Sequence, residues 1–378
     1  MPDTAEHIVP DTAETLAALE AETIVEPTNA TAAELVGRHF RVRDHYDVGR
    51  EKIREFARAV RNDHAAHHRE TDAAELGYGG LLASPTFASV IGAATTRSLI
   101  GSVLTEYDVS QILQTDQVFE YHRPILAGDR LGVDVVVENI RGFGDNDFIT
   151  VKVTLTDADV RPVLVATTTI VARKGVEIDP VAVETVSGVV MHGHVVEPGQ
   201  FDTDPNGLIL LAPEEVAEPA APAAPLPVNT VPTAAGVAAG TELPAAKVPV
   251  TRGDLVNYAG VSGDPNPIHF SDTAATLVGL PTVVAHGMLT MGLTAGYLVD
   301  WLGDPSALGK FSVRFSGFVP VEPTAPTFVE FTGKVKSVDA ATGAATVVLG
   351  ATSEGKKLFG RAIAEVRLSR LPETSAHG

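Results

Sequence analysis

An acidic residue and a histidine stand five residues apart in a loop rich in proline and glycine. The segment Tyr258–His269 reads YAGVSGDPNPIH, and it holds Asp264 and His269 among two prolines and two glycines. Proton-transfer catalysis needs an acid and a base in fixed geometry, which a stiff loop can provide. The same residues also fit an ordinary turn, so a purely structural role is the competing interpretation.

The start of a helix can supply a third group. Ala285, His286 and Gly287 lead into a long apolar stretch. The first N–H groups of a helix have no partner inside it, so the N–H of Gly287 can donate to a carbonyl oxygen that becomes negative. An acid, a base and such a donor together suit removal of the proton alpha to a thioester carbonyl. We therefore take Asp264, His269 and Gly287 as candidate catalytic residues.

A long buried helix is predicted directly after this tripeptide. Residues 287–302 are apolar on nearly every side, which is typical of a helix enclosed by other elements. Gly292 and Gly296 lie one turn apart there, so a neighbouring backbone can approach closely. The other elements predicted for this half are helices over 252–259 and 272–278 and strands near 310–319, 327–337, 344–352 and 357–369.

The first half of the chain follows the same plan. The predicted elements there are helices over 50–60 and 85–99 and strands near 114–123, 130–141, 147–156 and 162–172. A helix, a loop, a long apolar helix and four strands thus occur twice, which indicates an internal duplication of domain size. We predict an α+β protein with two such domains, each a curved antiparallel sheet around a long central helix.

Acidic charge is concentrated in two segments outside the predicted domains. The net charge is −20, but residues 1–34 contain eight acids without any Lys or Arg, and residues 175–247 contain ten acids and one Lys. We predict a mobile acidic leader over 1–34, a Pro/Ala-rich linker over 175–247, and domains over 35–174 and 248–378. No Lys/Arg run is long enough for a nucleic-acid site, and the absence of cysteine excludes disulfides and thiolate metal sites.

One charge-free stretch has the length of a membrane span. The 27 residues between Asp272 and Asp300 contain no Asp, Glu, Lys or Arg, but Pro281, His286 and four glycines interrupt them. A spanning helix needs about 20 mainly apolar residues, so a buried core helix is the better interpretation. The N-terminus has neither the basic nor the apolar segment of a secretory signal. We therefore expect a cytoplasmic protein without a membrane span.

The loop and its surroundings match a known family. The signature Gly-Asp-x-Asn-Pro-x-His is met by Gly263, Asp264, Asn266, Pro267 and His269. Residues 248–369 thereby resemble the MaoC-like (R)-specific enoyl hydratase/dehydratase family, which has a hot-dog fold. The two halves further resemble the HadA and HadB subunits of the (3R)-hydroxyacyl-ACP dehydratase. The stretches that carry this likeness are REKIREF (50–56), AAELGY (73–78), PTF (85–87) and PILAGD (124–129) for HadA, and DLVNYAGVSGD (254–264), AHGMLTMG (285–292) and FGRAIA (359–364) for HadB.

The resemblance implies a double hot-dog protein with a catalytic HadB-like half and a HadA-like half that shapes the acyl tunnel. The implied activity is (3R)-hydroxyacyl-ACP dehydration, in reverse (R)-specific hydration of trans-2-enoyl thioesters, in type II fatty-acid elongation of the mycolic-acid type. His269 would take the C2 proton, Asp264 would handle the departing water, and Gly287 would supply the oxyanion N–H. Asn266 and His286 would serve substrate binding, with Asn266 orienting the loop or a water.

The resemblance also implies which partners the protein uses. It implies no cofactor and no metal. The substrate would be an acyl-ACP or acyl-CoA thioester, and an acyl carrier protein would be the partner. The two halves would form a pseudo-dimer within one chain, with the association of two chains left open.

The first half contains a similar acid–histidine pair. Asp63 and His68 have the same five-residue separation as the pair in the second half, which makes a second active site conceivable. Two alanines, Ala65 and Ala66, replace the Asn-Pro step. Pro85, which has no N–H, falls at or beside the oxyanion position. These departures argue against a second working site.

Three other functions compete with the dehydratase. An enoyl-CoA hydratase of degradation or polyester supply would use the same pair. A hot-dog thioesterase would need an acid on the long helix, which offers only Asp300. An acyl-thioester-binding protein without dehydratase activity would not need the pair. Carrier proteins are acidic, so the carrier hypothesis requires a basic docking patch. Its candidates are Arg38, Arg41, Arg43, Arg50, Lys52, Arg54, Arg58 and Arg61.

Overall fold

The architecture is taken from a computed structural model of the chain. The structure describes residues 32–105, 107, 112–173 and 204–370, together with Glu184, Val186, Gly188, Val189 and Met191. The predicted leader lies almost entirely outside the described residues, and so does most of the first part of the predicted linker. The domain boundaries drawn from the sequence stay predictions.

In its described residues, the first half combines a sheet with three helices. The helices are α2 (Arg50–Ala59), α3 (Glu70–Glu75) and α4 (Ala88–Ser102), with 3-10 turns η1 (Ala32–Leu35) and η2 (Ala65–His67). The strands are β1 (His39–Val42), β2 (Tyr46–Asp47), β3 (Ile112–Tyr121), β4 (Arg130–Phe143), β5 (Asn146–Thr156) and β6 (Pro162–Arg173). Helix α2 buries Ile53, Phe56 and Ala57, at the helical spacing of three to four residues that predicted it.

The second half repeats this order. It is preceded by β7 (Leu208–Leu210) and η5 (Pro213–Glu215). Its helices and turns are α6 (Arg252–Ser262), η6 (Pro267–His269), α7 (Asp272–Leu277), α8 (Gly287–Leu302) and η7 (Pro305–Ala307). Its strands are β8 (Glu242–Val250), β9 (Leu308–Phe315), β10 (Thr327–Val338), β11 (Ala344–Ser353), β12 (Lys356–Lys357) and β13 (Phe359–Arg367). The two copies of one plan expected from the sequence are therefore present.

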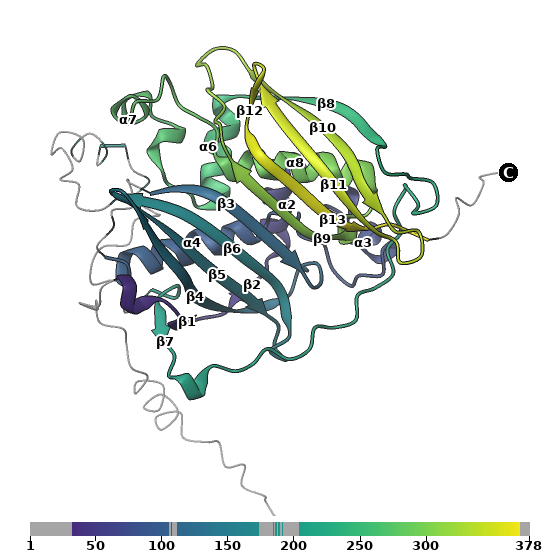
Figure 1. Ribbon diagram of the computed structural model, residues 1–378, viewed down its shortest axis with the longest axis horizontal. Coiled ribbons are helices and arrows are strands. Elements are labelled where there is room, and N and C mark those ends of the chain that lie inside the picture. Colours follow the sequence, from purple (N-terminus) through teal and green to yellow (C-terminus); the bar gives the residue numbers. More distant parts are fainter. Residues whose placement is uncertain are drawn as a thin grey trace, which may run out of the picture.

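Both halves contribute to one antiparallel sheet, which has 13 strands among the described residues. Eleven of them follow the order β7-β1-β4-β5-β6-β3-β9-β13-β11-β10-β8, while β2 pairs with β4 and β12 with β11 outside this order. The halves join where β3 pairs with β9. In Figure 1 the blue and teal strands of the first half continue into the green and yellow strands of the second, and α4 and α8 lie behind them. The prediction of a pseudo-dimer with its sheets side by side is confirmed.

The two long helices differ in how completely they are enclosed. Every residue of α8 from Leu289 to Val299 is buried, as predicted, whereas α4 keeps a row of half-exposed residues that includes Gly92, Thr96 and Arg97. Across the described part of the chain, no helix is both long enough and apolar enough to cross a membrane. The charge-free stretch thus forms a core helix.

Two elements differ from the sequence prediction. Helix α4 begins at Ala88 instead of Pro85, because Phe87 N donates to Ser84 O (2.8 Å) and closes a separate turn. Strand β8 begins at Glu242, inside the segment predicted as linker, and it contains Pro244 and Pro249. Proline is tolerated in an edge strand, and β8 pairs with β10 alone among the described strands.

Candidate active site

The turn after α6 presents the predicted acid. Helix α6 ends at Ser262 and is capped by Gly263, whose left-handed backbone (φ 75°) favours glycine, and Asp264 follows directly. Asn266 N donates to Asp264 Oδ1 (3.2 Å), and Ile268 N donates to Asn266 Oδ1 (3.2 Å). Asn266 therefore caps η6 and holds the loop, which was one of its two expected roles.

His269 has a defined tautomer. Its Nδ1 lies 2.7 Å from Val284 O, and because a carbonyl oxygen only accepts, Nδ1 carries the proton and Nε2 keeps its lone pair. Burial lowers the pKa of His269, against smaller opposing effects of the Asp264 charge and of the bond to Val284. The ring is thus neutral near pH 7, and Nε2 can act as a base.

His286 packs against the ring of this base. Its ring is 1% exposed and stacks on that of His269, with centroids 3.6 Å apart and planes 25° from parallel. Burial, followed by the neighbouring His269, lowers the pKa of His286 well below its usual value. The ring of Tyr258 also packs against that of His286, with centroids 4.9 Å apart. This burial fits a role in orienting His269 better than the substrate contact expected from the sequence.

The predicted acid, base and oxyanion donor come together at the start of α8. Polar side-chain atoms of Asp264, His269 and His286 all lie within 4.8 Å of one another. Gly287 follows His286 as the first residue of α8, so its N–H is one of those that a helix leaves unpaired. The arrangement can remove a proton at one atom while it stabilises negative charge at another.

The same cluster has an acid and two histidines, so a metal ion must be considered. A bound ion needs ligand lone pairs that converge on one point. The rings of His269 and His286 instead stack face to face, whereas a ligand nitrogen points at its ion in the plane of its ring. Nδ1 of His269 is also occupied by Val284 O. The geometry therefore favours acid–base chemistry, and the expectation of no metal stays a prediction.

The first half supplies cations to this site that the sequence did not reveal. Arg97 of α4 donates from Nη1 to Gly263 O (2.9 Å), and Lys52 of α2 donates from Nζ to Val261 O (2.6 Å). Both carbonyls belong to the end of α6, where a helix leaves its acceptors unpaired. No local motif marks either cation, and only the duplicated plan suggested that the halves would meet here.

The first half contains a counterpart of the site, shifted by one residue from the expected pair. His67 Nδ1 lies 2.7 Å from Leu82 O, fifteen residues on, as His269 does with Val284. The counterpart of His269 is thus His67, and five residues before it stands Asn62 in place of the acid. Asp63 and His68, which made a second site conceivable, do not take these positions, since Asp63 is exposed and His68 Nε2 bonds to Asn62 O (3.2 Å).

This counterpart is sealed. Asn62 Nδ2, His67 Nε2 and Ser84 Oγ are buried without a partner, whereas His269 Nε2 is not among the sealed polar atoms of the described residues. Pro85 follows Ser84 at the position of Gly287, so the oxyanion N–H is missing, as predicted. A Cβ on Gly292 of α8 would lie 2.6 Å from Val60 Cγ1, next to this cluster. The first half therefore lacks the acid, the donor and the access of the second.

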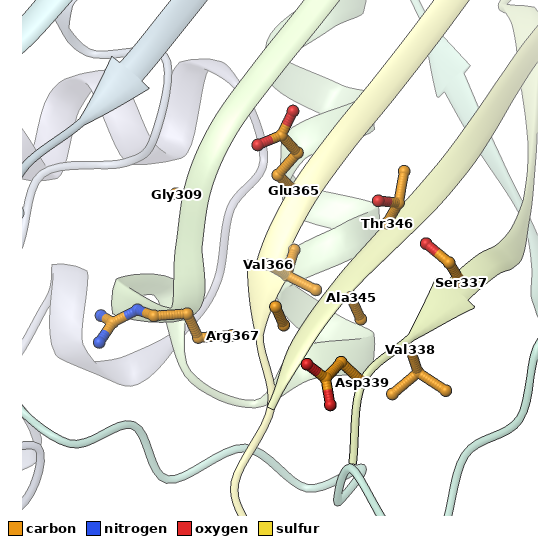
Figure 2. A pocket seen from close by; sticks show the side chains of 10 residues that line it. Gly309, Ser337, Val338, Asp339, Ala345, Thr346, Glu365, Val366 and Arg367 are labelled. Atoms are coloured by element: carbon orange, nitrogen blue, oxygen red, sulfur yellow. The ribbon is translucent and has the colours of Figure 1, made fainter. Parts of the chain in front are cut away.

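A separate hollow lies on the outer face of the sheet. Figure 2 shows Thr346, Asp339 and Glu365 around it, over β9, β10, β11 and β13. Glu365 and Asp339 are exposed to solvent, and none of the residues just assigned to the active site lines the hollow. It does not contribute to the acid–base cluster.

Comparison with known proteins decides the family. The model described as the FAS1-like dehydratase domain region matches residues 34–166, and that of the MaoC like domain matches residues 235–353. A solved structure described as a MaoC-like dehydratase is 41% identical, with a TM-score of 0.80, and the match covers 89% of this chain and 99% of that one. The chain belongs to the MaoC-like dehydratase family. It is therefore an enzyme of the hydratase and dehydratase class.

Other known proteins are similar to one part of the chain or to its fold. A UPF0336 protein of Mycobacterium tuberculosis is 42% identical to this chain over 146 residues, which are 39% of this chain and 92% of that protein. A UPF0336 protein of Saccharopolyspora erythraea is 40% identical over 146 residues, or 38% of this chain and 92% of its own. A Mycobacterium tuberculosis protein described as a double hotdog fold has 16% identity and a TM-score of 0.56, over 88% of this chain and 96% of its own. The double hot-dog fold predicted from the sequence is confirmed.

Proposed function

We propose that this MaoC-like dehydratase converts (3R)-hydroxyacyl thioesters to trans-2-enoyl thioesters and water, and catalyses the reverse hydration. The observation that carries the proposal is the defined tautomer of His269. Its bond to Val284 O leaves Nε2 as a base within the cluster that contains Asp264. The residues proposed as catalytic are Asp264, His269 and Gly287, in the second half of the chain.

The proposed reaction uses each group once. His269 Nε2 takes the proton from C2 of the hydroxyacyl thioester, and the Gly287 N–H donates to the thioester oxygen as it becomes negative. The C2–C3 double bond forms, the C3–O bond breaks, and Asp264 gives the leaving hydroxyl its proton to form water. Hydration runs through the same steps in reverse.

Hydrolysis of the thioester is less well supported. The acid that a thioesterase would need on the long helix is Asp300, near the C-terminal end of α8 and remote from His286 at its start. Burial raises the pKa of Asp300, the charge of Asp63 from the first half raises it further, and His64 of the first half lowers it. It thus belongs to the surroundings of the sealed counterpart.

The finer proposal is that the substrate is carried by an acyl carrier protein, in type II fatty-acid elongation of the mycolic-acid type in the cytoplasm. The resemblance of both halves to dehydratase subunits of that kind supports it. Most of the eight proposed docking cations already have partners within the chain. The pairs are Arg38 with Glu34 O, Arg41 with Asp134, Arg50 with Glu70, Lys52 with Val261 O, Arg54 with Glu51, and Arg61 with Asp254. Arg43 and Arg58 are the remaining candidates.

Hydration of a trans-2-enoyl-CoA, followed at the enoyl absorbance, tests the activity. His269→Asn puts an amide N–H where Nδ1 stood, which keeps a donor for Val284 O, but it removes the base, so we expect a loss of about 10² to 10⁴ in rate. His67→Asn is the matched control, since it makes the same exchange beside Leu82 O. The control should leave the rate close to native. The product of the native chain should be the 3R alcohol.

Several outcomes would contradict these assignments. An equal loss in both variants would place catalysis in both halves. A native chain without hydration at any acyl length would refute the dehydratase proposal. The same assay with enoyl-ACP tests the carrier, because a kcat/KM no higher than that for enoyl-CoA would contradict a carrier-protein substrate.

A further inference from the structure

Arg97 connects the half without an active site to the half that has one. Its guanidinium extends from α4 and donates from Nη1 to Gly263 O at 2.9 Å, across 166 residues of sequence. Gly263 ends α6 in the left-handed conformation, and Asp264 is the next residue. Arg97 thus bonds the turn from which the catalytic carboxylate projects.

We propose that Arg97 is a positioning residue of the active site, which fixes the Asp264 turn and holds a permanent positive charge beside that carboxylate. This proposal rests on the proposed dehydratase function. It makes the site a product of both halves, because the second half alone would lack the cation. It also gives the half with a sealed counterpart a role in the reaction.

The charge around Asp264 comes from several elements. His269 on η6 and His286 before α8 are its histidine neighbours, and both are neutral because burial lowers their pKa values. Tyr258 on α6 also interacts with the Asp264 charge. Arg97 faces Asp264 and Asp204, and it is half-buried. Among these groups Arg97 is the one that stays positive at every pH of interest.

Lys52 provides a comparison that separates charge from packing. It donates to Val261 O, two residues before Gly263, from the same half of the protein. It caps the end of α6 just as Arg97 does, since cations near a helix C-terminus satisfy its last carbonyls. Loss of Lys52 therefore reports the structural part of the effect. Loss of Arg97 reports the structural part together with the charge beside Asp264.

The test is the pH dependence of kcat/KM for enoyl-CoA hydration by the full chain. In Arg97→Met the acid limb should move to higher pH by about one unit, because hydration needs Asp264 ionised to take the proton of water, and a nearby cation favours the ionised carboxylate. Arg97→Lys should keep the limb near its native place, with a lower rate from the lost Gly263 bond. Lys52→Met should lower thermal stability and leave the limb unmoved.

A second readout does not depend on turnover. The full chain is labelled with ¹³C at its aspartate carboxyl carbons and studied by NMR. The signal that disappears in Asp264→Asn belongs to Asp264. The titration of this signal is then compared between the native chain and Arg97→Met. A signal that titrates at higher pH than in the native chain supports the proposal even if no enoyl thioester is hydrated. An acid limb and a titration both unchanged in Arg97→Met would overturn it while leaving the dehydratase activity standing.

Discussion

At the scale of single residues, two histidines make the same bond in different surroundings. His67 and His269 each donate from Nδ1 to a backbone carbonyl at 2.7 Å. His67 is completely buried, and burial lowers its pKa to about 3, with His64 and His68 adding to this effect. A histidine that cannot take a proton in the folded state is a source of acid sensitivity.

The stability of the protein should therefore depend on pH through His67. The unfolded chain protonates this residue near pH 6.5, but the folded chain does so only near pH 3. Between these values the unfolded state binds the extra proton, so the free energy of unfolding falls by about 1.4 kcal/mol per pH unit as pH decreases. In His67→Gln this share of the slope should disappear. Urea unfolding at pH 7, 6, 5 and 4 measures it.

A suitable control is the half-exposed His122. His122→Gln serves as the reference for the loss of one histidine outside the core. A slope in His67→Gln equal to the native slope would mean that His67 takes its proton in the folded protein.

The candidate catalytic residues of the second half lie together in the structure, whereas the counterpart of their histidine in the first half stands one residue before His68. Asp63–His68 and Asn62–His67 both have a spacing of five, so spacing alone could not choose between them. The spacing between each histidine and its carbonyl acceptor could have done so. His269 and Val284 are fifteen residues apart, and so are His67 and Leu82.

Arg97 could not have been found from local sequence. Its partner Gly263 is 166 residues away, and the contact exists only because α4 packs beside α6. Sequence spacing describes groups within one element or loop. It carries no information about a side chain that another domain contributes.

At the scale of elements, α8 closes the counterpart site through a glycine. A Cβ on Gly292 would lie 2.6 Å from Val60 Cγ1 and 3.1 Å from Thr86 Oγ1. Gly292→Ala should gain roughly 1 kcal/mol in helix propensity, but overpacking costs about 1–3 kcal/mol. We expect net destabilisation in urea unfolding, which Val60→Ala in the same chain should relieve.

The control is another helical glycine with open space around it. A Cβ on Gly260 of α6 would meet nothing within 4 Å, and the residue is exposed. Gly260→Ala should therefore stabilise the protein by about 0.5–1 kcal/mol. Destabilisation of similar size at both positions would show that the contact with Val60 is not what makes Gly292 necessary.

The elements were largely predictable because their apolar periodicity is strong. The helix expected over 287–302 is α8, Gly287–Leu302, and the main strands fall within a few residues of their predicted places. Strand β8 was missed because its prolines and its Ala-rich surroundings suggested a connector. Its place is set by pairing with β10, more than 70 residues later, and not by its own pattern.

At the scale of the whole molecule, the two halves share one core across the seam between β3 and β9. Five residue pairs form this seam, and Phe119 lies opposite Phe311 in the pair next to the central one. Both rings are buried, at 1% and 0% exposure. Two ion pairs lie beside them, Arg314 with Asp116 (2.8 Å) and Lys310 with Glu120 (2.7 Å).

The apolar pair should hold the seam far more strongly than the charges do. Phe311→Ala removes a fully buried ring, which costs about 3–5 kcal/mol. The ion pairs are largely solvated, and such pairs contribute about 0.2–1 kcal/mol each. The double variant Asp116→Asn/Glu120→Gln should thus lose about 2 kcal/mol at most. Urea unfolding of the full chain compares the two. If the charge variant were as unstable as Phe311→Ala, the halves would be joined by electrostatics, and the shared sheet would not explain how Arg97 is kept beside the active site.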